Sequence, residues 1–257
     1  MIHQVYELWF KQMLWEIESV TRIFSEPVVD ERLMLVVINR LTRVLEIQKI
    51  LVDQIRVLET MDPLDFMAFR GYLVPASGFQ SIQFRKLENL LGLRPENRTT
   101  YQQQHYKSYF TKEQVEVLED SEQVPSLLML VEKWLERTPG LELGEYKFWD
   151  AYCGAVQNML ASQRQTIADR PDMDEFERGA MLAASKKSEE LFQGVVDPKV
   201  YDEEKEEGKH RISHKAMQGA LMIHMYRQEP RFNLPYQMLR LLCEIDNMMV
   251  RKGTSLF

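Results

Sequence analysis

Two places in the sequence carry side chains whose types and spacing could do chemistry. His3 opens a run of apolar and aromatic residues, where an imidazole can act as a base or hydrogen-bond donor in a ligand pocket. Phe66 and Arg70 lie four residues apart within LDFMAFRGYL, so on a helix they share one face. A ring surface beside a guanidinium suits a ligand with an aromatic ring and a carboxylate. The plainer interpretations are a helix-end histidine that faces water and an arginine that extends into solvent or forms a structural ion pair.

Two further patterns could bind ions. The stretch VPASGFQSIQFR at 74–85 contains Ser77 and precedes a helix start, where backbone N–H groups could bind an anion; an ordinary capped turn explains it as well. His210 and His214 have the i, i+4 spacing that can hold a metal on a helix, but no third ligand follows at a diagnostic distance. His224, between Ile223 and Met225, is most simply a core histidine. The sequence has no phosphate-binding glycine loop, CxxC pair or serine-nucleophile elbow.

The elements that must position these residues are helices. Apolar residues recur at three- and four-residue steps along most of the chain. In the second helix they form one stripe that only Gln48 interrupts: Met34, Val37, Leu41, Val44, Leu51, Ile55 and Leu58. The predicted helices cover 2–24, 31–59, a short segment from Pro63, a segment ending near Gly92, a segment from Thr111, 126–137, 145–168, 174–193, 213–228 and 235–250. The stretch EPRFNLP at 229–235 is expected to separate the last two of these helices. The charge run 202–211 is predicted to be a solvated loop or frayed helix end, and Ala216, Ala220, Ile223 and Met225 are expected to face inward.

Local signals mark several of the helix starts. Asp62 is a good N-cap before Pro63, which suits the first helical position. Ser77 with Gln80, and Thr111 with Gln114, form capping-box patterns. No alternating strand of convincing length and no internal repeat is present in the sequence. The prediction is an all-α, single-domain helical bundle over residues 1–257.

Composition narrows the class of protein. The chain is 45% hydrophobic and 28% charged, as ordered globular domains are, and its net charge of −7 argues against nucleic-acid binding. No apolar run approaches the roughly 18 residues of a membrane span, and the first residues do not form a secretion signal. Two cysteines are too few for a disulfide framework. A cytoplasmic location is expected.

Several segments, in order along the chain, resemble the tryptophan 2,3-dioxygenases of animals. The longest, LETMDPLDFMAFRGYLVPASGFQSIQFRKLEN at 58–89, is too long and varied to match by chance. The others are HQVYELWFKQMLWEIESV at 3–20, LLMLVEKWLERTPGLE at 127–142, FW at 148–149, ISHKAMQGALMIHMYRQEPRF at 212–232 and LLCEIDNMM at 241–249.

The resemblance implies a fold, an activity and site residues. Members of this family are all-α proteins with haem b (an iron porphyrin) and are usually homotetramers. With O₂ they open the C2–C3 bond of the indole ring of L-tryptophan to give N-formylkynurenine, the first step of the kynurenine pathway. His3 matches the distal histidine beside the indole N–H, Arg70 the residue that clamps the substrate carboxylate, and Phe66 the aromatic residue that packs on the substrate. Ile2 falls among the residues that line the pocket, and Ser77 in the loop that approaches the haem edge.

The resemblance also implies that family segments are missing at both ends. Relatives have a further segment before His3, and beyond EIDNMM they continue to the proximal histidine that ligates the haem iron. Counting from Arg251, that histidine would fall at Leu256, and leucine cannot bind iron. Neither His105 nor His210, His214 or His224 matches a ligand position. We therefore expect poor turnover by these 257 residues alone, and the alternative is a non-catalytic helical paralogue or fragment that associates with full-length subunits.

Overall fold

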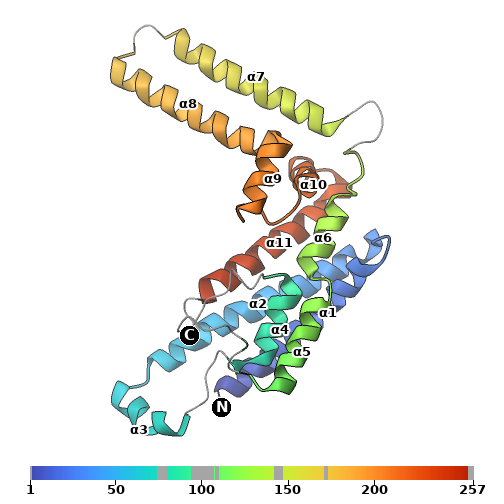
Figure 1. The fold of residues 1–257 in the computed structure, drawn as a ribbon, viewed down its shortest axis with the longest axis vertical. Helices are drawn as coiled ribbons and strands as arrows, with labels where there is room; N and C mark the ends of the chain where they lie inside the picture. Colours follow the sequence, from blue (N-terminus) through green and yellow to red (C-terminus); the bar gives the residue numbers. More distant parts are fainter. Residues whose placement is uncertain are drawn as a thin grey trace. The chain divides into compact units, whose positions relative to one another are not determined.

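The computed structural model describes residues 2–73, 80–93, 107, 110–141, 147–170 and 173–253. Over these ranges the chain forms helices and no strand, which confirms the all-α prediction (Figure 1). The helices are α1 Ile2–Ser25, the 3₁₀ helix η1 Glu31–Leu33, α2 Met34–Glu59, α3 Pro63–Leu73, α4 Ile82–Leu91, α5 Lys112–Gln123, α6 Leu127–Leu135, α7 Phe148–Ala168, α8 Glu175–Val196, α9 Pro198–Glu206, α10 His214–Met225 and α11 Pro230–Gly253.

The chain divides into two compact units, which are described separately. One contains residues 1–131 and 226–257, and the other contains residues 132–225. The single domain expected over 1–257 stays a prediction. None of the helices within the described ranges has the length and hydropathy that a membrane crossing needs.

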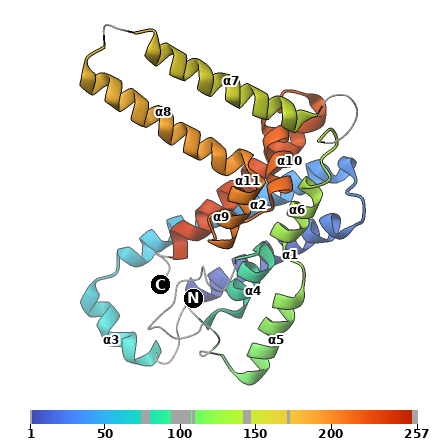
Figure 2. The same cartoon turned by 45° about the horizontal axis from the view of Figure 1, so that its top comes forward.

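The core of the first unit lies along α2. Val37, Leu41 and Val44 are fully buried there, as the predicted stripe requires. Helices α1 and α11 pack on α2, and both views show α2 and α11 side by side (Figures 1 and 2). The stripe does not stay buried to the end of α2, because Leu58 is exposed. Apolar burial of this kind contributes roughly 1.5–3 kcal/mol for each large side chain.

Gln48, the polar interruption in that stripe, is buried against α11. Its Nε2 lies 3.4 Å from the carbonyl oxygen of Ile245, and the side chain is 1% exposed. A buried amide is tolerated where it forms hydrogen bonds. The interruption therefore marks where α2 meets the backbone of another helix.

The caps of the first unit are mostly those that the sequence predicts. The carboxylate of Asp62 accepts from the N–H of Leu64 at 2.7 Å, and Thr111 with Gln114 forms the full capping box. The predicted box of Ser77 and Gln80 is wrong as the start of α4. Its N-cap is Ser81, whose Oγ accepts from the N–H of Phe84 at 3.1 Å. Ser81 has the extended backbone of an N-cap, and Ser77 lies outside the described residues.

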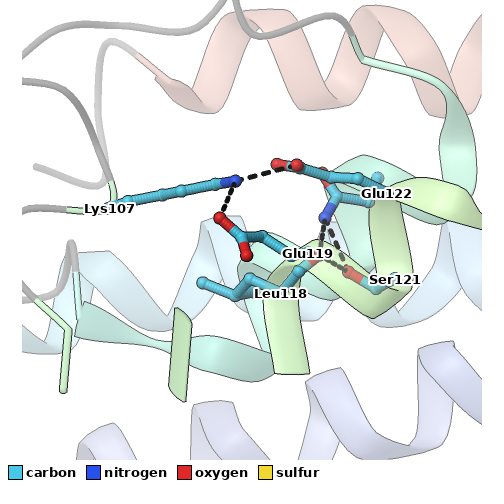
Figure 3. A network of polar contacts seen from close by, with 6 residues as sticks. Lys107, Leu118, Glu119, Ser121 and Glu122 are labelled. Atoms are coloured by element: carbon cyan, nitrogen blue, oxygen red, sulfur yellow. Dashed lines mark hydrogen bonds and ion pairs between the residues drawn. The ribbon is translucent and has the colours of Figure 1, made fainter. Parts of the chain in front are cut away.

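Polar contacts join α4, α5 and the segment before α5. The Nδ2 of Asn89 donates to Ser121 Oγ at 2.7 Å. Lys107 reaches Glu119 at 3.3 Å and Glu122 at 2.9 Å on α5 (Figure 3). Gly92 ends α4 in the left-handed conformation, with φ +90°, which glycine adopts readily.

The last helix differs from its prediction. The stretch EPRFNLP does not interrupt it, because α11 begins at Pro230 and contains Pro235. Pro230 takes the first helical position, where a missing N–H costs nothing. Pro235 lacks the N–H that would reach the carbonyl oxygen of Arg231, so the helix loses one hydrogen bond near its start. Packing of Met238, Leu241 and Ile245, which are buried, outweighs that loss.

The second unit is built from two helix pairs. Helices α7 and α8 run antiparallel along each other (Figures 1 and 2). Helix α9 packs on both α8 and α10. In α7 the buried residues after Phe148 are Val156, Leu160 and Ile167, whereas α8 buries only Gly194.

The structure decides between the two alternatives for the charge run 202–211. The run contains a helix end and is not a loop throughout, because α9 continues to Glu206 and Gly208 then reverses the chain with φ +83°. Ala216 and Ile223 are buried as expected and Ala220 is partly buried, but Met225 is exposed and Met222 is buried.

Candidate functional site

His3 lies in the first turn of α1 and is exposed to solvent. The helix behind it is fixed to two neighbours. Tyr6 donates its hydroxyl to the carbonyl oxygen of Leu51 on α2 at 2.6 Å, and burial raises the pKa of that hydroxyl. The rings of Phe10 and Phe84 lie 5.2 Å apart and join α1 to α4. An exposed imidazole on an anchored helix end is free to meet a ligand. Ile2 is the first residue of the same helix.

A contact near His3 was not anticipated from the sequence. Nε2 of Gln83 on α4 lies 2.7 Å from the carboxylate Oε2 of Glu7 and 3.0 Å from the carbonyl oxygen of Glu7. Glu7 follows His3 by four residues, so the two occupy neighbouring positions on one helix face. The i, i+4 spacing could have drawn attention to Glu7. Nothing local in the sequence links it to Gln83.

Helix α3 carries the other two predicted substrate residues. Asp62 caps it, and Phe66 and Arg70 lie one turn apart with both side chains exposed. The ring of Phe66 meets that of Phe69 edge to face, with the centroids 5.4 Å apart. The predicted pairing of an aromatic surface with a guanidinium on one helix is therefore present. It offers one group for a ring and one for a carboxylate.

The exposed side of α3 is unusually apolar. Leu64, Met67 and Tyr72 are all more than half exposed, with Tyr72 at 89%. Contiguous exposed apolar side chains commonly mark a surface that binds a ligand or another chain. His3 lies on α1 and Arg70 on α3, and a pocket shared by the two stays a prediction. Ser77 and Leu256 fall outside the described residues.

The remaining described histidines do not have the surroundings of a metal site. His210 precedes α10, so it does not share a helix with His214, and their spacing of four residues does not place them on one helix face. Its ring stacks on Tyr201 at 4.1 Å, and its Nε2 lies 3.0 Å from Glu204 Oε2. His224 is exposed, so the prediction of a core histidine is wrong as well.

The resemblance implies a haem, and the described residues do not fit its iron. His214 is the buried imidazole, and both of its nitrogens have partners. Nε2 lies 2.8 Å from the carbonyl oxygen of Val195, and Nδ1 lies 3.3 Å from Nε2 of Gln218. An axial ligand needs a nitrogen lone pair directed at the metal. Within the described part of the chain no group of three or more His, Cys, Asp or Glu side chains could hold a metal ion.

Comparison with known proteins agrees with the all-α fold and the order of the segments. The family profile described as Tryptophan 2,3-dioxygenase matches residues 1–253. The tryptophan 2,3-dioxygenase of Dictyostelium discoideum is 47% identical over 248 residues, which is 96% of this chain and 62% of the relative. Tryptophan 2,3-dioxygenase A of Danio rerio and the Xenopus tropicalis enzyme of that name are each 48% identical over 250 residues, 97% of this chain and 61% of the relative. The chain thus spans about three fifths of the length of these curated relatives. It belongs to the tryptophan 2,3-dioxygenase family.

Proposed function

We propose that this chain serves a haem-dependent dioxygenase that cleaves the indole C2–C3 bond of L-tryptophan. One L-tryptophan and one O₂ give one N-formylkynurenine, the entry to the kynurenine pathway, so both oxygen atoms enter the product. Family membership supports the reaction. The observation that carries the substrate is the exposed pair Phe66 and Arg70, one turn apart on α3.

The proposal gives the described residues the substrate side of the site. Arg70 holds the carboxylate of tryptophan through a bidentate contact, and Phe66 packs against the ring. His3 lies beside the indole N–H and orients it, and Ile2 lines the pocket next to it. Haem b is the cofactor, and Ser77 approaches its edge. Because the described histidines do not fit its iron, we derive no step of the reaction from them.

Assembly and location complete the proposal. A homotetramer in the cytoplasm, with L-tryptophan and O₂ as its small-molecule partners, is expected from the family. Neither a nucleic acid nor a membrane is expected as a partner, since the net charge of −7 disfavours a phosphate backbone. The alternative, a non-catalytic helical protein that associates with full-length subunits, has no observation in its favour.

Product formation tests the reaction, and ligand binding tests the site. The complete gene product is loaded with hemin, reduced, and supplied with L-tryptophan in air. We expect N-formylkynurenine in the amount of the O₂ consumed, with Arg70→Ala raising the tryptophan concentration needed. A protein that retains no porphyrin and forms no product under any reconstitution would refute the dioxygenase proposal and favour the non-catalytic alternative.

A further inference from the structure

The ring of Phe69 contacts the ring of Phe66 within α3. Their centroids lie 5.4 Å apart and their planes meet at 83°, so the edge of one ring points at the face of the other. Aromatic rings attract each other in this arrangement, because the positive edge of one meets the negative face of the other. The ring that the proposed function assigns to the substrate is therefore held by a second ring.

Phe69 is the more sheltered of the two residues. Among residues 63–72, the part of α3 whose exposure the structure describes, Phe69 is half-buried and every other residue is exposed. Phe66 is 39% exposed, compared with 80% for Leu64 and 60% for Met67 on the same helix. The Phe66 ring is thus partly covered, and the rest of it is open to a ligand.

Helix geometry places Phe69 and Arg70 on different sides of Phe66. Successive residues are about 100° apart around the axis of an α-helix, so Phe69 lies about 60° from Phe66 in one direction and Arg70 about 40° in the other. Helical side chains also lean toward the N-terminus, which brings both over the turn that carries Phe66. Phe69 therefore occupies the side away from Arg70. A ligand ring that packs on the open side of Phe66 has its carboxylate toward the guanidinium.

A ring that is held before the ligand arrives binds more tightly. A phenylalanine side chain without such a neighbour turns about two bonds and loses that freedom when a ligand packs on it. This loss of conformational entropy opposes binding. A neighbouring ring that already restricts Phe66 reduces the loss and raises the affinity.

We propose that Phe69 is a positioning residue, which holds the Phe66 ring in the orientation that receives the indole ring of tryptophan. The inference rests on the proposed function, because that function supplies the substrate ring. It gives Phe69 no contact with the substrate, since the residue acts through Phe66. Its effect on binding should therefore vanish where the Phe66 ring is absent.

A double-mutant cycle tests whether Phe69 acts through Phe66. Calorimetric titration measures the Kd of the complete gene product for L-tryptophan. Phe69→Leu keeps an apolar side chain and removes the ring, and we expect it to raise Kd about two- to tenfold, the worth of one aromatic pair. In a Phe66→Leu background the same substitution should change Kd by less than about twofold. Equal effects of Phe69→Leu in the two backgrounds would overturn the inference.

Two further variants separate positioning from a general disturbance of α3. Phe69→Tyr keeps the ring, and its Kd should stay within about twofold of the native value. Phe176→Leu makes the same substitution at an exposed phenylalanine of α8 and should leave Kd unchanged. If Phe69→Tyr loses as much affinity as Phe69→Leu, any change at this position disturbs the helix, and the inference is wrong.

The ring contact can also be observed without a ligand. The complete gene product is labelled with 4-fluorophenylalanine and studied by ¹⁹F NMR, and a Phe66→Leu spectrum assigns the Phe66 signal. The ring current of Phe69 shifts that signal. Phe69→Leu should therefore move it toward the shift of free 4-fluorophenylalanine, and Phe69→Tyr should leave it near its native position. A Phe66 signal that does not respond to Phe69→Leu would contradict the proposal.

These outcomes are distinct from that of the proposed reaction. Tryptophan binding with the expected cycle but no N-formylkynurenine would refute the dioxygenase proposal and leave the role of Phe69 in place. Product formation with equal effects of Phe69→Leu in the two backgrounds would do the reverse. A native protein that binds no tryptophan would overturn both.

Discussion

Glu16 on α1 and Arg40 on α2 form an ion pair whose carboxylate is completely buried. Oε2 of Glu16 lies 3.0 Å from Nη1 of Arg40, and Oε1 lies 2.5 Å from Nη1 of Arg43. The guanidinium of Arg40 also lies over the ring of Trp15, 4.7 Å from its centroid. The two arginines remain partly exposed, so the buried charge is neutralised by groups that stay in contact with water. This cluster ties α1, which carries His3, to the central helix.

Replacing Glu16 should weaken the first unit. Glu16→Gln removes the charge that strengthens the hydrogen bonds from Arg40, Arg43 and Gln12, and we expect a loss of about 1.5–3 kcal/mol in the free energy of unfolding. Urea unfolding followed by circular dichroism measures it. Glu18→Gln on the same helix is the control and should stay within about 0.5 kcal/mol of the native protein. Equal effects of the two substitutions would show that the buried pair contributes little.

Gly219 should tolerate no side chain. A Cβ there would overlap the carbonyl oxygen of Leu135 and lie 2.8 Å from Thr138 Oγ1, so α10 could not approach the end of α6. We expect Gly219→Ala to destabilise the protein by roughly 1–3 kcal/mol, as overpacking does. Gly179→Ala, on α8 with open space around it, should instead be stabilising by roughly 0.5–1 kcal/mol. If α10 approaches the end of α6 this closely at Gly219, thermal unfolding should show a lower Tm for Gly219→Ala and a higher Tm for Gly179→Ala.

Tyr201 should make the second unit sensitive to alkali. Its side chain is 2% exposed, and burial, with smaller effects from Glu132 and Asp202, raises its pKa to about 12. A raised pKa contributes stability that is complete below the ordinary value of 10.0 and is lost as the pH rises to about 12. The full contribution is of the order of 2–3 kcal/mol.

Tyr201→Phe isolates that contribution. The variant loses the hydrogen bond to the carbonyl oxygen of Ile212, 3.2 Å away, so it should be less stable than the native protein at pH 8. Between pH 10 and about 12 the native protein should lose this advantage, because its phenol ionises on unfolding and the phenyl ring cannot. Urea midpoints of both proteins across this range provide the measurement. Parallel midpoint curves would argue against a buried, protonated Tyr201.

Arg70 should strengthen the binding of ligands that carry a carboxylate and leave the binding of those without one unchanged. We expect Arg70→Ala to weaken L-tryptophan binding by about ten- to a hundredfold, which corresponds to roughly 1.5–3 kcal/mol for a charge-assisted bidentate contact. Tryptamine, which lacks the carboxylate, should bind the native protein and the variant equally. Calorimetric titration of the complete gene product with both ligands tests this. Unchanged tryptophan affinity in the variant would remove Arg70 from the site.

Much of the helical architecture could be read from the sequence because its causes are local. The buried stripe of α2 follows from apolar spacing, and the caps at Asp62 and Thr111 need only neighbouring residues. The pairing of Phe66 with Arg70 is equally local, since a helix alone brings residues four apart together. These features depend on periods of three and four residues, which the printed sequence displays.

Other features depend on which helices meet. Pro235 remains inside α11 because the residues after it pack on α2, and α9 continues into a charge run because it packs on α8 and α10. Apolar spacing could not distinguish Ser81 from Ser77 as a cap, since both precede the same run.

The sequence by itself determined the helices, several of their caps and the family to which the chain belongs. Only the tertiary structure decided that Gln83 reaches Glu7 and that Glu16 is buried between two arginines. The physical reason is distance along the chain. A hydrogen bond between residues 76 positions apart has no period or local signal in the sequence, and it forms only when two whole helices pack face to face.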